Sequence, residues 1–308
     1  MTMNFLNKLR GLVLASTLCL AALSFAETYA LMIGINDYPE PTDARGQPLR
    51  DANGNLVSED LHGCVNDVTE MSEILKTGFK VKPENIRLIT NGQANENGFV
   101  EGMRWLLRSA KPGDQVVFMY SGHGAQIADT TEADGKQEVL VLADHKLVPD
   151  KFFQELSNLW VKSGIRATLI FDSCHSGGMD RMPADVIAKQ KFTARLPKSA
   201  APVAAQRLTQ LQGAVAKPRQ AQAPGSFAFL FAGQESQTTS DLQFKDNSPA
   251  HGAFTLIMLA ILKDIPTAPA QEMVDVVKDV LEKNKFAQVP NAVFSSPERA
   301  KEPILLMN

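Results

Sequence analysis

A set of continuous apolar runs, each bounded by turn residues, constrains the fold of this chain more than any other feature. The runs cover residues 29–35, 86–90, 115–120, 138–142, 167–171 and 227–231. Continuous rather than alternating apolar character is typical of strands that are covered on both faces. Apolar residues also recur at helical spacing within residues 68–75, 99–107, 152–159, 253–262 and 273–281. This alternation predicts an α/β fold of three layers, with a mostly parallel central sheet of about six strands and helices on both faces.

The N-terminus has the order of a secretory signal peptide. Lys8 and Arg10 precede an apolar run at residues 11–23, which small residues and then polar residues follow. The pattern predicts a signal peptide over residues 1–26, cleaved after Ala26. The alternative is an uncleaved anchor, although the run is shorter than the roughly 20 residues that cross a bilayer. We therefore expect an exported chain, periplasmic or secreted, without a membrane span once the signal is removed.

One long stretch departs from the alternating pattern. Residues 182–225 are rich in Ala, Gln, Pro, Lys and Arg, and Phe192 is their only aromatic residue. This composition predicts an exposed, flexible linker between a larger part at residues 27–181 and a smaller part at residues 226–308. The alternative is a plain surface loop, but so long a loop within a domain is unusual and is often functional or disordered.

Composition excludes some classes of partner. The formal net charge is −3, and no basic cluster appears, so we expect no nucleic-acid partner. Removal of the signal leaves two cysteines, Cys64 and Cys174, in a compartment that oxidises thiols. They could form one structural disulfide, or at least one could be kept as a thiol for chemistry.

Two of the expected strands run directly into residues with catalytic chemistry. The run 115–120 continues into Ser121-Gly122-His123-Gly124, and the run 167–171 continues into Asp172-Ser173-Cys174-His175. Ligands of open α/β sheets bind where parallel strands deliver their carboxyl ends. An imidazole beside a thiol favours the thiolate, which is the nucleophilic form. The sequence therefore predicts that Cys174 is a nucleophile and that His123 exchanges its proton.

A binding pocket is expected beneath this pair. Ser121 and Asp172 each precede a catalytic candidate by two residues, so each should share its face of the strand, one step deeper. An ionised carboxylate there favours a guanidinium or ammonium guest, which predicts cleavage after Arg or Lys. The alternative is that Asp172 only caps the following turn. His145 and His251 have no convincing partners in the sequence.

The motifs together resemble those of the metacaspase branch of the caspase-like cysteine peptidases, over nearly the whole mature chain. The similar segments are Tyr-Ser-Gly-His-Gly around His123, Asp-Ser-Cys-His-Ser-Gly around Cys174, Leu61 to Asp67, Ala30 to Asn36, Gln237 to Asp241 and Gly252 to Thr255. The resemblance implies a Cys–His dyad at Cys174 and His123, and an oxyanion held by the backbone N–H groups of Gly124 and Cys174. It also implies a basic-residue pocket built from Cys64, Asp67, Ser121 and Asp172, in which Cys64 is a pocket thiol rather than half of a disulfide.

Calcium is the one metal that the resemblance suggests. The family often binds it through acidic residues after the catalytic histidine, but here Gln137 stands where an acid is expected. Oxygen ligands suit calcium, which takes six to eight of them, and four side chains nearby carry them: Asp129, Glu132, Asp134 and Glu138. An exposed acidic loop is the alternative. No redox or organic cofactor is expected, and calcium is not assumed to be required.

These patterns predict a cysteine endopeptidase that cleaves proteins or peptides after Arg or Lys through an acyl-enzyme. We also expect self-cleavage in the linker, which offers Lys189, Lys191, Arg195, Lys198, Arg207 and Arg219 as basic residues. Two alternatives stay open. One is a catalytically silent caspase-like module that binds a peptide or protein partner in the same cleft. The other is a transferase or ligase that uses the same acyl-enzyme.

Overall fold

The computed structural model describes residues 26–307 with eight gaps, which are residue 44, residue 52, residue 134 and the ranges 174–185, 192–195, 197–199, 216–223 and 235–236. The predicted signal peptide lies almost wholly outside the described residues, so it stays a prediction. Within the described part of the chain, no helix is both long enough and apolar enough to cross a membrane.

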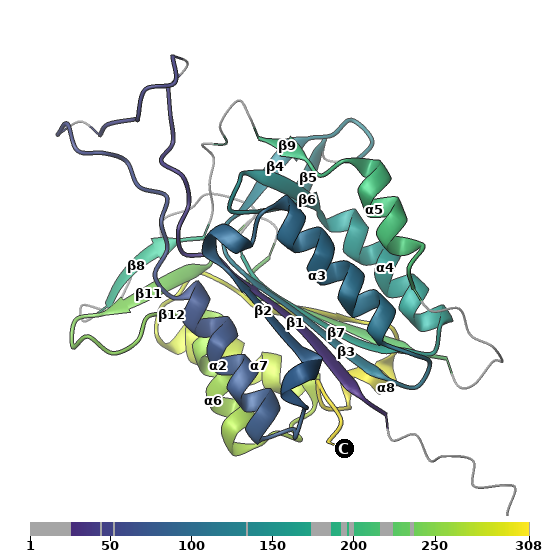
Figure 1. The fold of residues 1–308 in the computed structure, drawn as a ribbon. Helices are drawn as coiled ribbons and strands as arrows, with labels where there is room; N and C mark the ends of the chain where they lie inside the picture. The colour runs from purple at the N-terminus through teal and green to yellow at the C-terminus, as the bar shows by residue number, and fades with distance from the viewer. Residues whose placement is uncertain are drawn as a thin grey trace, which may run out of the picture.

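The central layer is a sheet of six strands in the order β13-β10-β7-β3-β1-β2 (Figure 1). Its strands are β1 (Thr28–Gly34), β2 (Ile86–Thr90), β3 (Gln115–Ser121), β7 (Arg166–Asp172), β10 (Ser226–Phe231) and β13 (Asn291–Phe294). All neighbours pair in parallel except β13, which runs antiparallel to β10. The predicted fold class is confirmed.

One expected strand lies outside this sheet. The apolar run at residues 138–142 belongs to β5 (Lys136–Val141), which pairs antiparallel with β4 (Gly124–Ala128) and β6 (Lys146–Pro149). The chain turns back directly after β4, so β5 pairs with that strand instead of crossing over to the central sheet. The sixth central strand is β13, whose four residues are too few and too exposed to give a continuous apolar signal.

Helices cover both faces of the sheet (Figure 1). One face carries α3 (Glu96–Ser109), α4 (Asp150–Lys162) and α5 (Ala205–Gln212), and the other carries α2 (Cys64–Thr77), α6 (Ala253–Asp264) and α7 (Ala270–Lys283). The remaining helical turns are η1 (Pro83–Asn85), η2 (Asn91–Gln93) and α8 (Pro297–Ala300). The five helices expected from periodicity are α2, α3, α4, α6 and α7.

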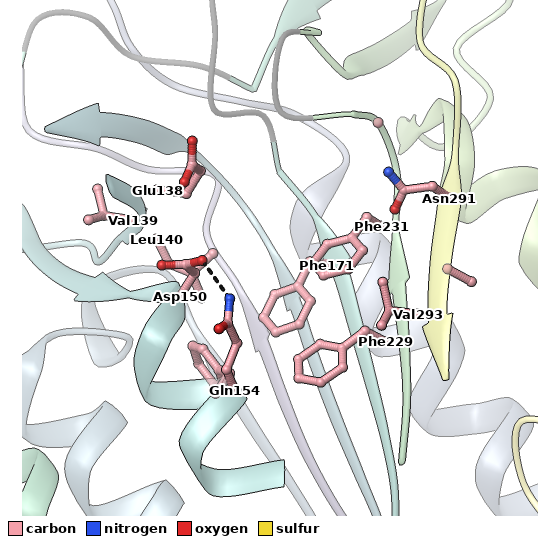
Figure 2. Close-up of a pocket in the computed structure, with 13 residues that line it drawn as sticks. Glu138, Val139, Leu140, Asp150, Gln154, Phe171, Phe229, Phe231, Asn291 and Val293 are labelled. Atoms are coloured by element: carbon pink, nitrogen blue, oxygen red, sulfur yellow. Dashed lines mark hydrogen bonds between the residues drawn. The ribbon is translucent and has the colours of Figure 1, made fainter. Parts of the chain in front are cut away.

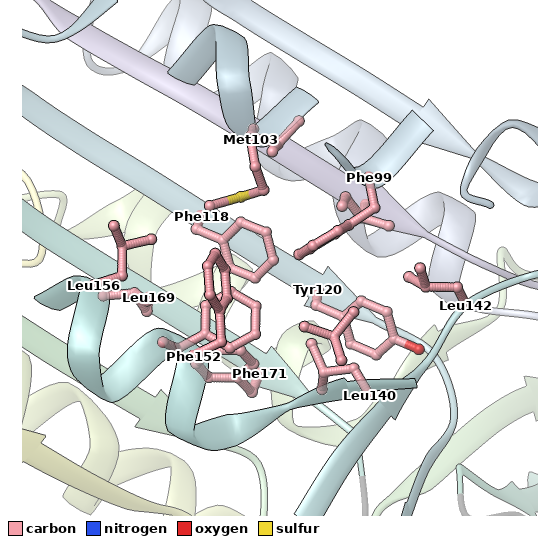
Figure 3. Packing of buried hydrophobic residues seen from close by; sticks show 14 of the residues in the cluster. Phe99, Met103, Phe118, Tyr120, Leu140, Leu142, Phe152, Leu156, Leu169 and Phe171 are labelled. Atoms are coloured by element: carbon pink, nitrogen blue, oxygen red, sulfur yellow. The ribbon is translucent and has the colours of Figure 1, made fainter. Parts of the chain in front are cut away.

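The alternation of side chains along β3 separates two hydrophobic cores. Phe118 and Tyr120 pack under α3 and α4 with Phe99, Met103 and other large side chains (Figure 3). The intervening residues of β3, Val117 and Met119, belong to the core under α2, α6 and α7. The next residue on that second face is Ser121, which is fully buried. The pattern therefore fixes which side of the sheet receives the polar residues at the strand end.

The stretch 182–225 is not a bare loop where it is described. It contains β8 (Val186–Gln190), β9 (Ala201–Pro202) and α5. β8 pairs antiparallel with β11 (Ser240–Phe244), which also pairs with β12 (His251–Gly252). Leu208 and Leu211 anchor α5 in the core, and Lys191 directly after β8 is 0% exposed. Regular elements and buried side chains are therefore present within the predicted linker, and its flexibility stays a prediction.

Candidate active site

The two strands that were expected to carry catalytic residues are neighbours in the sheet. β3 pairs with β7, and Ser121 lies opposite Asp172 at their carboxyl ends. β3 leads to His123, whereas β7 leads to Cys174, which lies outside the described residues. The structure therefore brings the two strand ends together, and the distance between the sulfur and the imidazole stays untested.

His123 is buried, with only 1% of its surface exposed. Its Nε2 atom lies 2.6 Å from the backbone carbonyl oxygen of Glu59 and 3.8 Å from the carboxylate of the same residue. The ring packs against Tyr38 at 4.5 Å between centroids, and the backbone N–H of His123 donates to the Tyr38 hydroxyl at 2.8 Å. These contacts hold the imidazole in one orientation.

The Glu59 contact also assigns the tautomer of His123. A carbonyl oxygen only accepts hydrogen bonds, so Nε2 carries the proton and Nδ1 keeps its lone pair. Nδ1 is buried and has no hydrogen-bond partner among the described residues. Burial lowers the pKa of His123, and the Glu59 carbonyl opposes that shift. The imidazole is thus a neutral base with Nδ1 available to accept a proton.

Four residues expected to form a pocket lie together beside β3 and β7. Asp67 in the first turn of α2 and Asp172 at the end of β7 are both 0% exposed. The Ser121 hydroxyl donates to Asp67 Oδ2 at 2.7 Å. Cys64 is a free, buried thiol, and burial raises its pKa, which keeps it protonated. Two carboxylates at one buried site require a cation.

Lys191 supplies that cation. Its ammonium Nζ lies 3.1 Å from Asp67 Oδ2 and 3.1 Å from Asp172 Oδ1, and it donates to Ser121 Oγ at 2.8 Å. Burial lowers the pKa of Lys191, but the charges of the two carboxylates outweigh burial and hold that pKa well above its ordinary value. The pocket that was predicted to accept a basic side chain is filled by a lysine of the same chain.

The backbone of Lys191 is held as well. The N–H of Gly124 donates to the carbonyl oxygen of Lys191 at 2.9 Å. The N–H of Lys191 donates to the carbonyl oxygen of Thr239 at 3.1 Å, which continues the antiparallel pairing of β8 with β11. Gly124 is the residue whose N–H was expected to hold an oxyanion. The segment 186–191 therefore lies extended along β11, with the Lys191 carbonyl at the predicted oxyanion donor.

Three residues around β12 complete the pocket, and the sequence did not single out their roles. The Nδ1 of His251 lies 3.0 Å from Asp67 Oδ1, and its Nε2 lies 3.2 Å from Glu70 Oε2. Thr255 Oγ1 donates to Asp172 Oδ2 at 2.6 Å. A Cβ at Gly252 would overlap the Asp172 carboxylate and the Lys191 ammonium. The prediction that His251 has no partners is wrong. Its partners, Asp67 and Glu70, lie on α2, which is far from His251 in the sequence.

A further carboxylate holds the start of α2, and with it Cys64 and Asp67. Asp241 accepts hydrogen bonds from the backbone N–H groups of His62 at 2.6 Å and Gly63 at 2.8 Å. A Cβ at Gly63 would lie 2.6 Å from Asp241 Oδ1. The start of α2 and the Asp241 segment can thus approach this closely only because residue 63 is a glycine, which has no side chain.

The calcium candidates are divided among different partners. Asp129 and Glu132 lie 3.0 Å and 2.7 Å from the Lys151 ammonium, and Glu138 accepts from Gln126 at 3.0 Å. Asp134 lies outside the described residues. No three His, Cys, Asp or Glu side chains of the described ranges are grouped so that they could hold a metal ion. Calcium binding stays a prediction.

A separate cavity of about 430 Å³ opens on the other face of β7 (Figure 2). Phe171, Phe229 and Phe231 form its apolar wall, and Asp150 lies across from them, where it accepts from Gln154 at 3.1 Å. Burial raises the pKa of Asp150 to about 6. Because Phe171 and Asp172 are consecutive on a strand, they point to opposite faces. This cavity is therefore not the acidic pocket.

The other basic residues of the predicted linker differ from Lys191. Arg207 lies on α5 and pairs with Glu96 at 2.6 Å, and Lys189 is half-buried. Arg195, Lys198, Lys217 and Arg219 lie outside the described residues. Among the described basic residues of this stretch, Lys191 is therefore the one between Asp67 and Asp172.

Comparison with known proteins points to one family. The model of the metacaspase, peptidase C14 domain matches residues 29–183. Metacaspase-1B of Neurospora crassa is 36% identical over 159 residues, which is 48% of this chain and 33% of that protein. Metacaspase-1A of Aspergillus oryzae is 28% identical over 304 residues, which is 87% of this chain and 68% of that protein. Metacaspase-1 of Schizosaccharomyces pombe is 28% identical and is matched over 64% of its length.

A solved structure shares the fold. The crystal structure of protein GSU0716 from Geobacter sulfurreducens superposes with a TM-score of 0.57, covering 92% of this chain and all of that chain, at 20% sequence identity. The matches to the curated relatives span between a third and about two thirds of their lengths.

Proposed function

From the premise that this chain belongs to the metacaspases of peptidase family C14, we propose that it is a cysteine endopeptidase that cleaves after Lys or Arg. The observation that carries the proposal is the position of Lys191. Its ammonium lies between Asp67 and Asp172, while its carbonyl oxygen accepts the Gly124 N–H. A residue held at both ends in this way has the placement of a substrate residue whose carbonyl is to be attacked.

In the proposed reaction, Nδ1 of His123 takes the proton of the Cys174 thiol, and the thiolate attacks the carbonyl carbon after the basic residue. The oxygen becomes an oxyanion that the Gly124 N–H holds, joined by the N–H of Cys174. The C–N bond then breaks, and the leaving amine receives the proton from His123. Water attacks the resulting acyl-enzyme, with His123 accepting its proton, and restores the thiol.

The same geometry supports self-processing at one bond. Lys191 occupies the proposed pocket within its own chain, so the bond expected to break is the one between Lys191 and Phe192. An uncut chain would keep its pocket filled and would process other substrates only after segment 186–191 leaves. In this proposal the chain therefore cleaves itself first and cleaves other proteins only afterwards.

Fluorogenic peptides that end in Lys, Arg or Asp test the activity, each with and without calcium. We expect release of the reporter from Lys and Arg peptides and none from Asp peptides, with loss of activity in Cys174→Ala and in His123→Ala. Binding of the Lys peptide without cleavage by wild-type protein would favour a silent binding module. Transfer of the acyl group to an added amine, in place of hydrolysis, would favour a transferase or ligase.

We also propose that the protein is exported, because residues 1–26 have the order of a signal peptide. Sequencing the N-terminus of the mature protein tests this, with Glu27 expected as the first residue. A full-length chain retained inside the producing cells would contradict export.

A further inference from the structure

The lysine two residues before Lys191 makes contacts of its own. Lys189 Nζ donates to the backbone carbonyl oxygen of Ser58 at 2.8 Å and also to that of Asp60. Lys189 and Lys191 are separated by two positions in an extended segment, so both side chains project to the same side. On that side lie the acidic pocket for Lys191 and the segment 58–60 for Lys189.

The surroundings of Lys189 are acidic as well as rich in acceptors. Burial lowers the pKa of Lys189, but the charges of Asp60 and Glu59 act in the opposite direction. Two carbonyl acceptors beside two carboxylates suit an ammonium, and they offer nothing to an aliphatic or acidic side chain. Asp60 is itself held, because its carboxylate accepts the N–H of Tyr38 at 2.9 Å.

The segment that contacts Lys189 also contacts the catalytic histidine. Glu59 lies between Ser58 and Asp60, and its carbonyl oxygen is the partner of His123 Nε2. A cation that bridges the carbonyls on either side of Glu59 restrains the backbone that orients the imidazole. Recognition two residues upstream is thus connected to the position of the base.

We propose that segment 58–60 forms a second cation subsite, which selects substrates with Lys two positions before the cleaved Lys or Arg. The proposal rests on the proposed peptidase function and extends it from one basic residue to a spaced pair. The preferred substrate class is an extended peptide of the form Lys-x-Lys or Lys-x-Arg, as in Lys189-Gln190-Lys191.

Three reporter peptides measure the subsite directly: Ala-Lys-Gln-Lys, Ala-norleucine-Gln-Lys and Ala-Ala-Gln-Lys. Norleucine keeps the aliphatic stem of lysine and removes its charge. Since a hydrogen bond to a charged group contributes about 1.5 kcal/mol or more, kcat/KM should fall about tenfold from the Lys peptide to the norleucine peptide. Because Glu59 orients His123, we expect kcat as well as KM to change. Equal kcat/KM for all three peptides would overturn the subsite and leave the peptidase proposal intact.

A binding measurement decides the subsite even if no peptide is cleaved. The triple variant Cys174→Ala/Lys189→Ala/Lys191→Ala leaves both the acidic pocket and segment 58–60 open and stops chemistry. Calorimetry with the same three peptides should give a Kd about tenfold lower for the Lys peptide than for the norleucine peptide. Equal Kd values would contradict the subsite. A Kd difference, together with no cleavage of the same peptides by the wild-type protein, would contradict only the peptidase.

Variants of the chain separate the subsite from general effects of charge. Asp60→Asn should reduce the preference for the Lys peptide over the norleucine peptide severalfold, whereas Glu272→Gln on the exposed face of α7 should leave that ratio unchanged. In self-cleavage, Lys189→Met should slow the reaction and Lys189→Arg should restore it, with Lys278→Met as the control for an exposed lysine. An unchanged ratio in Asp60→Asn together with an unchanged rate in Lys189→Met would overturn the assignment.

Discussion

The carbonyl oxygen of Lys191 accepts the backbone N–H of Gly124 at 2.9 Å, while the ammonium of the same lysine reaches two buried carboxylates. The residue is thus fixed at its carbonyl and at its side chain. A peptide bond in this position is presented to whatever nucleophile follows β7. This relationship connects the pocket, the predicted oxyanion donor and the stretch 182–225 in one arrangement.

Removal of Lys191 should open the pocket to an external cation. In a Cys174→Ala background, Lys191→Ala should bind p-aminobenzamidine at least tenfold more tightly than the chain that retains Lys191, because the two carboxylates lose their internal partner. Fluorescence titration of the probe measures this, with Lys278→Ala as the matched control. Equal affinities in all three proteins would show that Lys191 does not compete for the pocket.

The two pocket carboxylates should determine specificity for basic residues. Asp67→Asn and Asp172→Asn should each lower kcat/KM for Lys and Arg peptides by about a hundredfold or more, since removing one member of a buried ion pair costs about 3–5 kcal/mol. The exposed Asp279→Asn on α7 is the control. A change of less than threefold in both pocket variants would place the binding of the basic side chain elsewhere.

His251 should act as a positioning residue for Asp67. It lies between Asp67 Oδ1 and Glu70 Oε2 at 3.0 and 3.2 Å, so its loss frees the carboxylate to turn. We expect His251→Leu to raise KM for Lys peptides about tenfold with a smaller effect on kcat, and His251→Asn, which retains a donor, to recover part of the loss. Circular dichroism and thermal unfolding distinguish this effect from unfolding. A fall in kcat with no change in KM would contradict the assignment.

Gly252 should tolerate no side chain, because a Cβ there would overlap both Asp172 and Lys191. We expect Gly252→Ala to abolish self-cleavage and to reduce cleavage of Lys peptides at least tenfold. Gly213→Ala is the matched control, since its Cβ would lie 3.5 Å from the nearest atom. Activity of Gly252→Ala close to that of the control would mean that the pocket is wider than this arrangement requires.

Asp150 should make stability depend on pH. Burial raises its pKa to about 6 in the folded chain, from an ordinary value of 3.8, so the folded state holds a proton that the unfolded state releases. The stability that this provides is present below pH 3.8 and is lost as the pH rises through 6. We therefore expect Asp150→Asn to stabilise the chain by about 1–2 kcal/mol at pH 7.5 and very little at pH 4. Denaturant unfolding at both pH values, with Glu101→Gln as the control, tests this. Equal effects at both pH values would contradict it.

Periodicity predicted most of the architecture, because the strands of the central sheet are buried on both faces and their apolar runs are continuous. The sequence patterns did not predict β13, because it is a short, half-exposed edge strand without a continuous apolar run. The run at 138–142 was assigned to the wrong sheet, since apolar content identifies a strand but not its partner. The sequence also could not show that residues 186–190 pair with β11.

The pocket was partly predictable, because side chains alternate regularly between the two faces of a strand. Ser121 and Asp172 could be placed from period two along neighbouring strands. His251, Asp241 and Glu59 could not, because each contacts its partner across a large separation in the chain and none lies in a motif that demands it. Lys191 was one of seven basic residues in a stretch without pattern, and only its burial between two carboxylates distinguishes it.

The most direct test of the central claim is the exact mass of the fragments that the purified chain produces from itself. We predict one cut between Lys191 and Phe192 in the wild type and in Lys191→Arg, and no cut there in Lys191→Gln or in Cys174→Ala. A wild-type chain that stays intact under conditions where it cleaves Lys peptides, or one cut at another bond while Lys191–Phe192 stays whole, would contradict the account.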